Sequence, residues 1–503
     1  MDLIHNLVLG AGQVFQAGPL IAIVVGTIIG IGVGVLPGLS ASTGIALVLP
    51  FSFFLGPTTG LILMCALYTA AEYGGAIPAI AVNTPGEPSS MCTALDGYPL
   101  AKMGRMKDAL WVSLVTSAVG GLIGTFALIL FAPGLARFAL SFGAAEYVAL
   151  GFLGLSLAAS LSSKNYVKGA VTTLLGLLLA TFGQDPLTGS IRFSFGLPEM
   201  VEGFNLVPAL IGLFAASEVF SELFAAATPE GRIPVEQSKR RMPFSELWAL
   251  KRATVVGSLL GTIIGVIPGG GATIASLISY SEAKRVSKQP ELFGKGSLEG
   301  VAASESANNS CVGGALVPTL TLGIPGSGST AVMLGAFSMY GLHPGPELFR
   351  TDTALVYGLF VALIVANFSM LLFGAMGVSV WLYFMRLPKP ALMTLVMATC
   401  VVGAFAEQNS MWDVGVMLSF GMVGYILKRY DYPVSTVVIG LVLGFMMETN
   451  LRRAVLLGGW ESFVTRPLAA ILLLVAFTTL GYVAVREFKG RKRIQSAGIT
   501  GTH

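Results

Sequence analysis

The chain has 503 residues, of which 54% are hydrophobic and only 11% are charged, whereas about 25% are charged in an average soluble domain. This composition excludes a soluble globular protein, and the net charge of +4 is confined to a few basic loops rather than to a nucleic-acid-binding patch. Apolar runs of roughly 20 residues recur, which is the length that crosses a hydrocarbon core of about 30 Å. The β-barrel alternative fails because barrel strands alternate polar and apolar residues over about 10 positions. We predict an all-α polytopic membrane protein with about 10–12 membrane segments.

The sequence contains an internal repeat. Tyr73–Ser90 (YGGAIPAIAVNTPGEPSS) and Val312–Thr330 (VGGALVPTLTLGIPGSGST) both read Gly-Gly-Ala, then an apolar run with Pro, then Pro-Gly and small hydroxyl residues. Upstream, Gly26-Thr-Ile-Ile-Gly30 recurs as Gly261–Gly265, and Gly34-Val-Leu-Pro-Gly38 recurs as Gly265–Gly269. We interpret the chain as two halves of related structure.

The repeat suggests a division of the chain. We expect a polar joint between the halves to be cytoplasmic, because it carries Lys239–Arg241 and Lys251–Arg252. The expected parts are a first transmembrane repeat (1–230), a cytoplasmic linker (231–252), a second, inverted transmembrane repeat (253–450), an extra C-terminal transmembrane helix (451–486) and a basic cytoplasmic tail (487–503).

Loop charges indicate that the two halves have opposite orientations. Lys164 and Lys168 in the first half correspond to Glu407 and Asp413 in the second, and two further pairs of loops also change sign. Opposite orientation across the membrane explains these sign changes, so we predict an inverted-topology repeat. The basic pair Arg452–Arg453 is an exception, since the same count places it outside.

Each half begins with interrupted apolar segments. We predict two re-entrant hairpins and two crossings that are unwound near their middle. The hairpins are Pro19–Leu55, with its break at Pro37–Thr43, and Thr254–Ala283, with its break at Pro268–Thr273; the crossings are Gly60–Lys102, broken at Asn83–Ser90, and Ser297–His343, broken at Gly323–Thr330.

These four breaks are candidate binding sites. A break inside the bilayer persists only where protein, water, an ion or substrate satisfies the freed backbone groups. The helix N-termini that follow the breaks, with nearby hydroxyls and glycines, suit carboxylate groups. The alternative is that the glycines and prolines are packing kinks. The predicted substrate-binding residues are Ser40, Ser42, Thr43, Asn83, Thr84, Pro85, Gly86, Ser89, Ser90, Gly270, Gly271, Thr273, Pro325, Gly326, Ser327, Ser329 and Thr330.

Polar residues within the spanning segments are candidates for a coupling cation, either Na+ or H+. These are Asn308, Asn309, Glu87 and Glu72. The asparagines could equally form interhelical hydrogen bonds, and the glutamates could be salt-bridged. We expect no catalytic residues, metal site or covalent cofactor, because the chain lacks G-x-S-x-G, H-E-x-x-H and Walker motifs and its four cysteines show no C-x-x-C spacing.

Five motifs resemble the large membrane subunit of the tripartite tricarboxylate transporters, the TctA type. They are GVLPGLSAST, YGGAIPAIAVNTPGEPSS, GVIPGGGAT, ESANNSCVGGALVPTLTLGIPGSGST and GLHPGPELF. The resemblance implies a multi-pass permease of the bacterial inner membrane that takes up di- and tricarboxylates such as citrate by ion coupling. It also implies two partners, a small four-helix membrane subunit (TctB type) and a periplasmic solute-binding protein (TctC type). The run Ser304-Glu305-Ser306 departs from the more apolar run expected there.

We therefore expect an ion-driven carboxylate permease with a cytoplasmic C-terminus, in which hairpins and unwound helices form a mobile unit that moves as an elevator. An uncoupled anion channel and a non-transporting membrane scaffold remain alternatives. The residues leave open which carboxylate is carried and whether Na+ or H+ drives its uptake.

Overall fold

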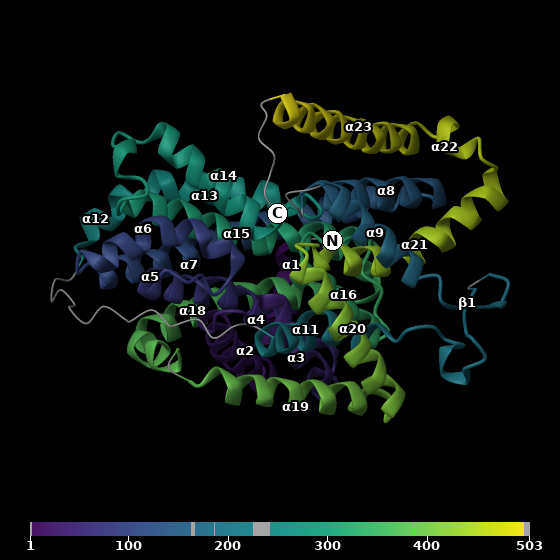
Figure 1. Ribbon diagram of the computed structural model, residues 1–503, viewed down its shortest axis with the longest axis horizontal. Helices are drawn as coiled ribbons and strands as arrows, with labels where there is room; N and C mark the ends of the chain where they lie inside the picture. The colour runs from purple at the N-terminus through teal and green to yellow at the C-terminus, as the bar shows by residue number, and fades with distance from the viewer. Residues whose placement is uncertain (1–2, 162–165, 186, 225–241, 386, 497–503) are drawn as a thin grey trace. The chain divides into compact units, whose positions relative to one another are not determined.

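The computed structural model is almost entirely helical (Figure 1). It describes residues 3–161, 166–185, 187–224, 242–385 and 387–496. Within these ranges, nine helices are long and apolar enough to cross a membrane, and the only sheet pairs the two-residue strands β1 (Gly183–Gln184) and β2 (Ile191–Arg192). The predicted all-α polytopic membrane fold is confirmed. The predicted basic residues Lys239–Arg241 and Lys164 lie outside the described ranges.

The helices of the first half follow the expected segments closely. They are α1 (Leu3–Val14), α2 (Ala17–Val35), α3 (Ala41–Ser52), η1 (Phe53–Leu55), α4 (Pro57–Gly74), α5 (Ala76–Val82), η2 (Pro88–Ser90), α6 (Met91–Lys102), α7 (Met106–Ala139), α8 (Ala144–Leu161), α9 (Tyr166–Leu179), η3 (Pro198–Met200), α10 (Leu206–Leu210), the π-helix η4 (Ile211–Ala216) and α11 (Ser217–Leu223).

The second half has a corresponding order of elements. Its helices are α12 (Phe244–Ala249), α13 (Lys251–Val266), α14 (Gly271–Val286), η5 (Pro290–Leu292), α15 (Leu298–Leu322), α16 (Gly328–Met339), α17 (Leu348–Thr351), α18 (Thr353–Phe384), α19 (Lys389–Gln408), α20 (Met411–Arg429), α21 (Val434–Gly458), α22 (Ser462–Thr465) and α23 (Pro467–Ser496). Each half thus contains two helices separated by a short break, α2 and α3 in the first half and α13 and α14 in the second.

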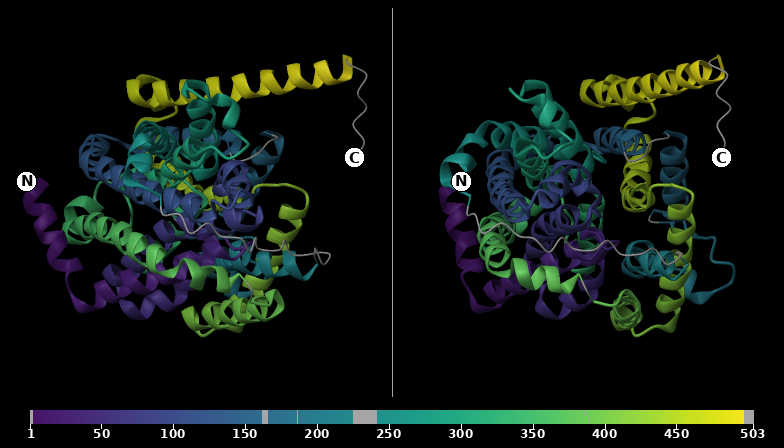
Figure 2. Two further views of the ribbon diagram at one scale, coloured as in Figure 1. Left: turned by 90° about the vertical axis from the view of Figure 1, so that its left-hand side faces the viewer. Right: turned by 60° about the vertical axis from the view of Figure 1, so that its left-hand side comes forward.

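Contacts divide the chain into two compact units, and the division differs from that between the sequence halves. One unit contains Met1–Leu140 and Asn205–Ile426, and the other contains Ser141–Phe204 and Leu427–His503. The first unit therefore combines the early helices of both halves. At its edge, the N-terminal helix α1 packs beside α18 (Figure 2).

Glycines allow close helix packing at two corresponding places in the first unit. A Cβ atom at Gly26, Gly30 or Gly34 of α2 would lie only 2.3–2.4 Å from a carbonyl oxygen of α4. In the same way, Gly257, Gly261 and Gly265 of α13 face carbonyl oxygens of α15 at 2.2–2.7 Å. Only glycine permits such backbone contact. The two glycine rows lie 231 positions apart in sequence. This alignment of the two halves differs by one helical turn from the alignment that the repeated Gly-Thr-Ile-Ile-Gly motif gives.

The long helices α7 and α18 pack across the two halves. α7 lies on α15, where Gly120 and Gly124 face the carbonyl oxygens of Ser306 and Ser310. α18 packs on α4 and α2. In the first unit, the helices of each sequence half are therefore partly covered by a long helix of the other half.

The second unit is built on α8, α9, α21 and α23. α9 and α21 approach closely, and Thr172 and Thr436 share a hydrogen bond of 2.6 Å between their hydroxyls. α21 extends to Gly458, past the predicted end of the second repeat at residue 450, and includes the Arg452–Arg453 pair. Arg452 forms ion pairs with Asp185 (2.5 Å) and Glu448 (2.9 Å). These acids offset the charge of the arginine that was an exception to the predicted loop pattern.

Candidate functional site

The two unwound crossings break in the same way. α5 ends at Asn83 and α15 ends at Gly323, and both residues adopt the left-handed conformation, with φ of 59° and 69°. The N–H of Asn83 donates to the carbonyl of Pro78, and that of Gly323 donates to the carbonyl of Pro318. A left-handed residue is a common helix stop. The breaks predicted at Asn83 and Gly323 are therefore present.

At the first break, the backbone lies against the first hairpin. A Cβ atom on Gly86 would lie 1.8 Å from the carbonyl oxygen of Gly34, and the Gly86 N–H donates to the carbonyl of Gly75 (3.1 Å). The buried carboxylate of Glu87 accepts a hydrogen bond from the N–H of Ala41, the first residue of α3. A carboxylate at a helix N-terminus satisfies an otherwise unpaired donor and complements the helix dipole. Glu87 thus joins the first break to the first hairpin.

At the second break, Ser327 caps the N-terminus of α16. Its hydroxyl accepts from the N–H of Thr330 (3.2 Å), while the Thr330 hydroxyl accepts from the N–H of Ser327 (2.9 Å). This reciprocal pair is a capping box. A Cβ atom on Gly326 would lie 2.8 Å from the carbonyl oxygen of Gly265 on α13. The second break therefore approaches the second hairpin as the first break approaches the first hairpin.

The hairpin breaks are shorter than the sequence predicts. Ser40 caps α3 by accepting from the Thr43 N–H (3.2 Å), which places Ser42 and Thr43 inside the helix. α14 begins at Gly271, so Thr273 is also helical, and its side chain is exposed. Each hairpin break contains a glycine with positive φ, Gly38 in the first and Gly269 in the second, which reverses the chain within a few residues so that the next helix starts earlier than predicted. α3 packs on α16, and α14 packs on η2 and α6.

Residues from both helix breaks reach the same face of α4. The hydroxyl of Tyr68 is hydrogen-bonded to that of Ser327 (2.9 Å). One turn along α4, the Glu72 carboxylate accepts from the Ser89 hydroxyl (2.8 Å). Residues four apart lie on one side of a helix, so Tyr68 and Glu72 bring hydroxyls from the two breaks to one buried surface.

The predicted asparagines complete this surface from α15. Asn308 donates to the carbonyl of Glu72, and Asn309 donates to the carbonyl of Thr69, each over 3.0 Å. Both side chains are fully buried. Their amide oxygens have no hydrogen-bond partner among the described residues. Buried polar atoms are normally paired, so two unpaired oxygens need an explanation. They are able to accept a hydrogen bond from a ligand or to coordinate a cation.

The structure also places a further buried carboxylate nearby. Glu305, one turn before the asparagines, accepts hydrogen bonds from the hydroxyls of Thr93, Ser113 (3.2 Å) and Ser117 (3.0 Å). It is fully buried. Glu305 therefore joins α15 to α6 and α7, which accounts for a polar residue at this unexpected position.

Asp96 holds the loop that leads into α15. One of its carboxylate oxygens accepts from the N–H groups of Gly294, Gly296 and Ser297 (2.8–2.9 Å), and the other accepts from the Tyr280 hydroxyl (2.8 Å). Because Tyr280 lies on α14, Asp96 ties the second hairpin to α6. Sequence analysis missed this role, although an acidic residue in a mostly apolar helix was a signal.

The other predicted residues are unevenly buried. Ser90 at the first break is buried. At the second break, Pro325 and Ser329 are buried, as are the cap residues. Gly270 packs against α13. Asn83 and Thr84 are exposed, and Pro85 and Gly271 are partly exposed. Tyr68 was not predicted. Its position corresponds to Asn308 at the 240-residue offset of the repeat, and this correspondence was the available signal.

These features define a polytopic helical membrane protein in which interrupted helices surround a buried polar surface. The model of the tripartite tricarboxylate transporter TctA family matches residues 20–439, and the chain belongs to this family of transporters.

Two proteins of Agrobacterium vitis are similar to the chain. An uncharacterised 52.8 kDa protein in the TAR-I ttuC' 3' region is 38% identical over 501 residues, which cover 98% of each chain. An uncharacterised protein in the TAR-II ttuC' 3' region is 35% identical over 215 residues, or 42% of this chain and 89% of its own length. No solved structure matches the chain.

Proposed function

We propose that this chain is the large permease subunit of a binding-protein-dependent secondary transporter that takes up di- or tricarboxylates, citrate-like in their chemistry, across the bacterial inner membrane. The observation that carries the proposal is the convergence of both helix breaks on Tyr68 and Glu72 of α4. Polar groups inside a membrane protein are costly to bury. A buried polar surface of this kind therefore marks a site of transport or binding.

The chemistry of the breaks favours an anionic substrate. Ser40 and Ser327 cap the N-termini of α3 and α16, and the two helices pack together. Helix N-termini carry partial positive charge and unpaired N–H donors, which suit carboxylate groups. In this proposal, the substrate displaces local partners such as Glu87 from the N-terminus of α3.

Coupling to a cation is supported by two unpaired oxygens on α15, which lie against α4. The amide oxygens of Asn308 and Asn309 are buried and without partners in the described part of the chain, and the amide nitrogen of Asn308 donates to the backbone carbonyl of Glu72. Such oxygens can bind a hard cation such as Na+. A cation there would also offset the negative charge of the substrate.

The inverted repeat and the elevator motion belong to this proposal. The matching caps at Asn83 and Gly323, and the matching glycine rows of α2 and α13, support two structurally related halves. In transporters with inverted repeats, the site lies at the interface of the repeats and discontinuous helices form it. Movement of this interface against the other helices would give alternating access.

Two partners complete the proposed transporter: a small four-helix membrane subunit of TctB type and a periplasmic solute-binding protein of TctC type. The family to which the chain belongs supports this proposal, because its transporters are tripartite. The binding protein would select the carboxylate before delivering it to the breaks.

The test is uptake of a panel of labelled carboxylates into vesicles that contain the assembled system, with and without a Na+ or H+ gradient. We expect accumulation against the carboxylate gradient only when an ion gradient is present. Equilibration without accumulation would identify a channel. Unchanged uptake after substitution of both Ser89 and Ser329 by Ala, in protein that still folds, would favour a scaffold role.

A further inference from the structure

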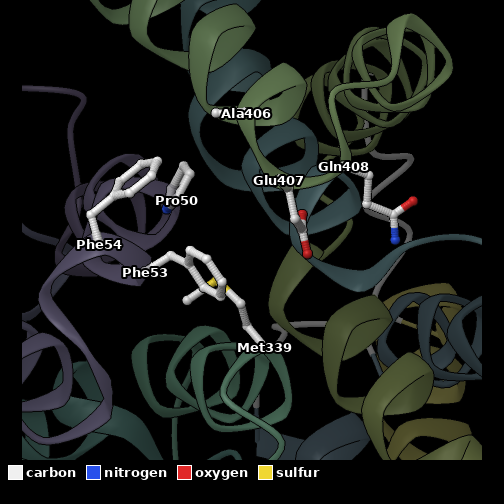
Figure 3. A pocket seen from close by; sticks show the side chains of 7 residues that line it. All are labelled: Pro50, Phe53, Phe54, Met339, Ala406, Glu407 and Gln408. Atoms are coloured by element: carbon white, nitrogen blue, oxygen red, sulfur yellow. The ribbon is translucent and has the colours of Figure 1, made fainter.

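A cavity in the first unit lies at the far ends of the two helices that begin at the proposed substrate site. Phe53 and Phe54 follow the C-terminus of α3, Met339 is the last residue of α16, and Glu407 and Gln408 end α19. Figure 3 shows the Glu407 carboxylate directed into the open space between these apolar side chains. Three helix C-termini therefore meet around one acidic side chain.

The electrostatics of this cavity favour positive charge. Helix C-termini carry partial negative charge on unpaired carbonyl groups. Glu407 adds a carboxylate at the unfavourable end of its own helix, and the lining contains no lysine, arginine or histidine. The cavity lining itself therefore supplies no cationic side chain to balance Glu407.

A second acid lies beside the first. Asn409, with φ of 54°, ends α19, and the short turn that follows places Asp413 in the first turn of α20, where its side chain is only 2% exposed. Each carboxylate is within electrostatic reach of the other, and the Asn205 side chain lies beside both.

The Asn205 side chain interacts with both acids, yet some atoms of this group stay without a geometrically good hydrogen bond. One oxygen of Glu407, one oxygen of Asp413 and the amide nitrogen of Asn205 are buried without a hydrogen-bond partner in the described ranges. The Asn205 oxygen is used to cap α10, accepting from the N–H of Val207 (3.3 Å). A buried carboxylate oxygen without a partner is strongly unfavourable, and two neighbouring acids of this kind are stabilised by taking up a proton or a cation.

We propose that Glu407 and Asp413 bind a hard monovalent cation, with Na+ as the probe, at the C-terminal ends of α3, α16 and α19. The N-termini of α10 and α20 face the same group and offset part of the charge of the two acids. No third acidic, histidine or cysteine side chain joins them within the described ranges, whereas calcium takes 6–8 oxygen ligands, typically from several carboxylates. A single positive charge therefore fits best.

The position of this site links it to transport, and this link rests on the proposed function. α3 and α16 carry their N-termini at the substrate site and their C-termini at the cation cavity. The two ligands would thus act on opposite ends of the same packed helices. A cation bound to α19 would hold α3 and α16 against that helix in one of the two transport states.

The experiment measures thermal unfolding of the purified full-length chain in NaCl and in choline chloride at equal ionic strength. We compare the native protein with Glu407→Gln, Asp413→Asn and the conservative variant Glu407→Asp. Glu347→Gln is the matched control, because Glu347 is 64% exposed and pairs with Arg350 at 3.4 Å. Binding of Na+ to the folded state must raise its stability.

We expect Na+ to stabilise the native protein and the control, and the half-saturating Na+ concentration to rise by about tenfold or more in Glu407→Gln and Asp413→Asn, with Glu407→Asp intermediate. In choline chloride, the two neutral variants should be as stable as the native protein or more so, because each removes an uncompensated charge. A merely structural role predicts a loss of stability in both salts, which would overturn the site.

A Na+ response that persists in Glu407→Gln and Asp413→Asn but disappears in Asn309→Ala would also overturn this inference, while leaving the proposed function intact. Stabilisation of the native protein by pH alone, without any effect of Na+, would overturn it as well. Uptake of carboxylate decides the proposed function separately from these measurements.

Discussion

Tyr68 is the residue that connects the first half to the second break. Its hydroxyl contacts Ser327, the N-cap of α16, at 2.9 Å. Tyr73 lies five residues further along the same helix, and its buried hydroxyl has no partner among the described residues. The two tyrosines are therefore a natural pair for comparison.

We predict that Tyr68→Phe lowers carboxylate uptake and destabilises the protein by about 0.5–1.5 kcal/mol, the net value of one hydrogen bond. Tyr73→Phe should be neutral or slightly stabilising, because it removes an unpaired polar group. Thermal unfolding and initial uptake rates of both variants check the prediction. Equal effects of the two substitutions would contradict the role of the Tyr68–Ser327 bond.

Asp185 is an acid of the second unit that its neighbours stabilise in the ionised form. It accepts hydrogen bonds from the N–H groups of Thr188 (2.9 Å) and Leu187 (3.0 Å). These bonds, with the nearby Arg452, lower the pKa of Asp185 to about 2, from about 3.9 in an unfolded chain.

A lowered pKa in the folded state means that ionised Asp185 contributes stability above about pH 4, and that this contribution is lost as the pH falls towards 2. We therefore predict that Asp185→Asn is less stable than the native protein at neutral pH, by an amount that stays constant down to about pH 4 and then shrinks. Unfolding midpoints measured across this range test it. A difference that grows on acidification would be the wrong sign.

At the scale of elements, paired rows of glycine determine how close the helices lie. A Cβ atom on Gly30 of α2 would lie 2.4 Å from the carbonyl oxygen of Leu67 on α4, whereas one on Gly32 of the same helix would meet no atom within 4 Å. Both glycines are helical and differ in the face that they occupy.

We predict that Gly30→Ala destabilises the protein by about 1–3 kcal/mol, because α2 must move away from α4. Gly32→Ala should stabilise it by up to about 1 kcal/mol through helix propensity alone. Thermal unfolding in one detergent compares the pair, and uptake shows whether the shift of α2 reaches the first break. Similar stability of both variants would argue against tight packing at Gly30.

At the scale of the whole molecule, the halves depend on each other. α7 packs on α15 and α18 packs on α4, so each broken crossing is covered by a long helix of the other half. A site shared by both halves can change accessibility when the hairpins move relative to the long helices. This motion is the elevator proposed above.

Cysteine labelling tests the motion. The four native cysteines are free and buried, so they should give little background with a membrane-impermeant maleimide. We predict that cysteines introduced by Ser42→Cys and Thr273→Cys, in the two hairpins, change their labelling from a given side by severalfold when substrate and Na+ are added. Labelling of each position from one fixed side under all conditions would count against alternating access.

The segments and breaks could be predicted from the sequence because they depend on local signals. The apolar runs indicated spanning helices, and the Pro-Gly pairs and the repeat indicated the stops at Asn83 and Gly323, before any contact was known. Asn308 and Asn309 were identified for the same reason, since an amide in a spanning helix needs a partner.

The partners themselves were decided only by tertiary structure. Tyr68 meets Ser327 across 259 residues, and the Asp96 carboxylate meets Ser297 across 201. Glu407 and Asp413 were understood as loop charges, and only packing against Asn205 and the ends of α3 and α16 leaves their oxygens buried. Hydropathy and helix stops are properties of neighbouring residues, whereas a binding site depends on which distant side chains meet.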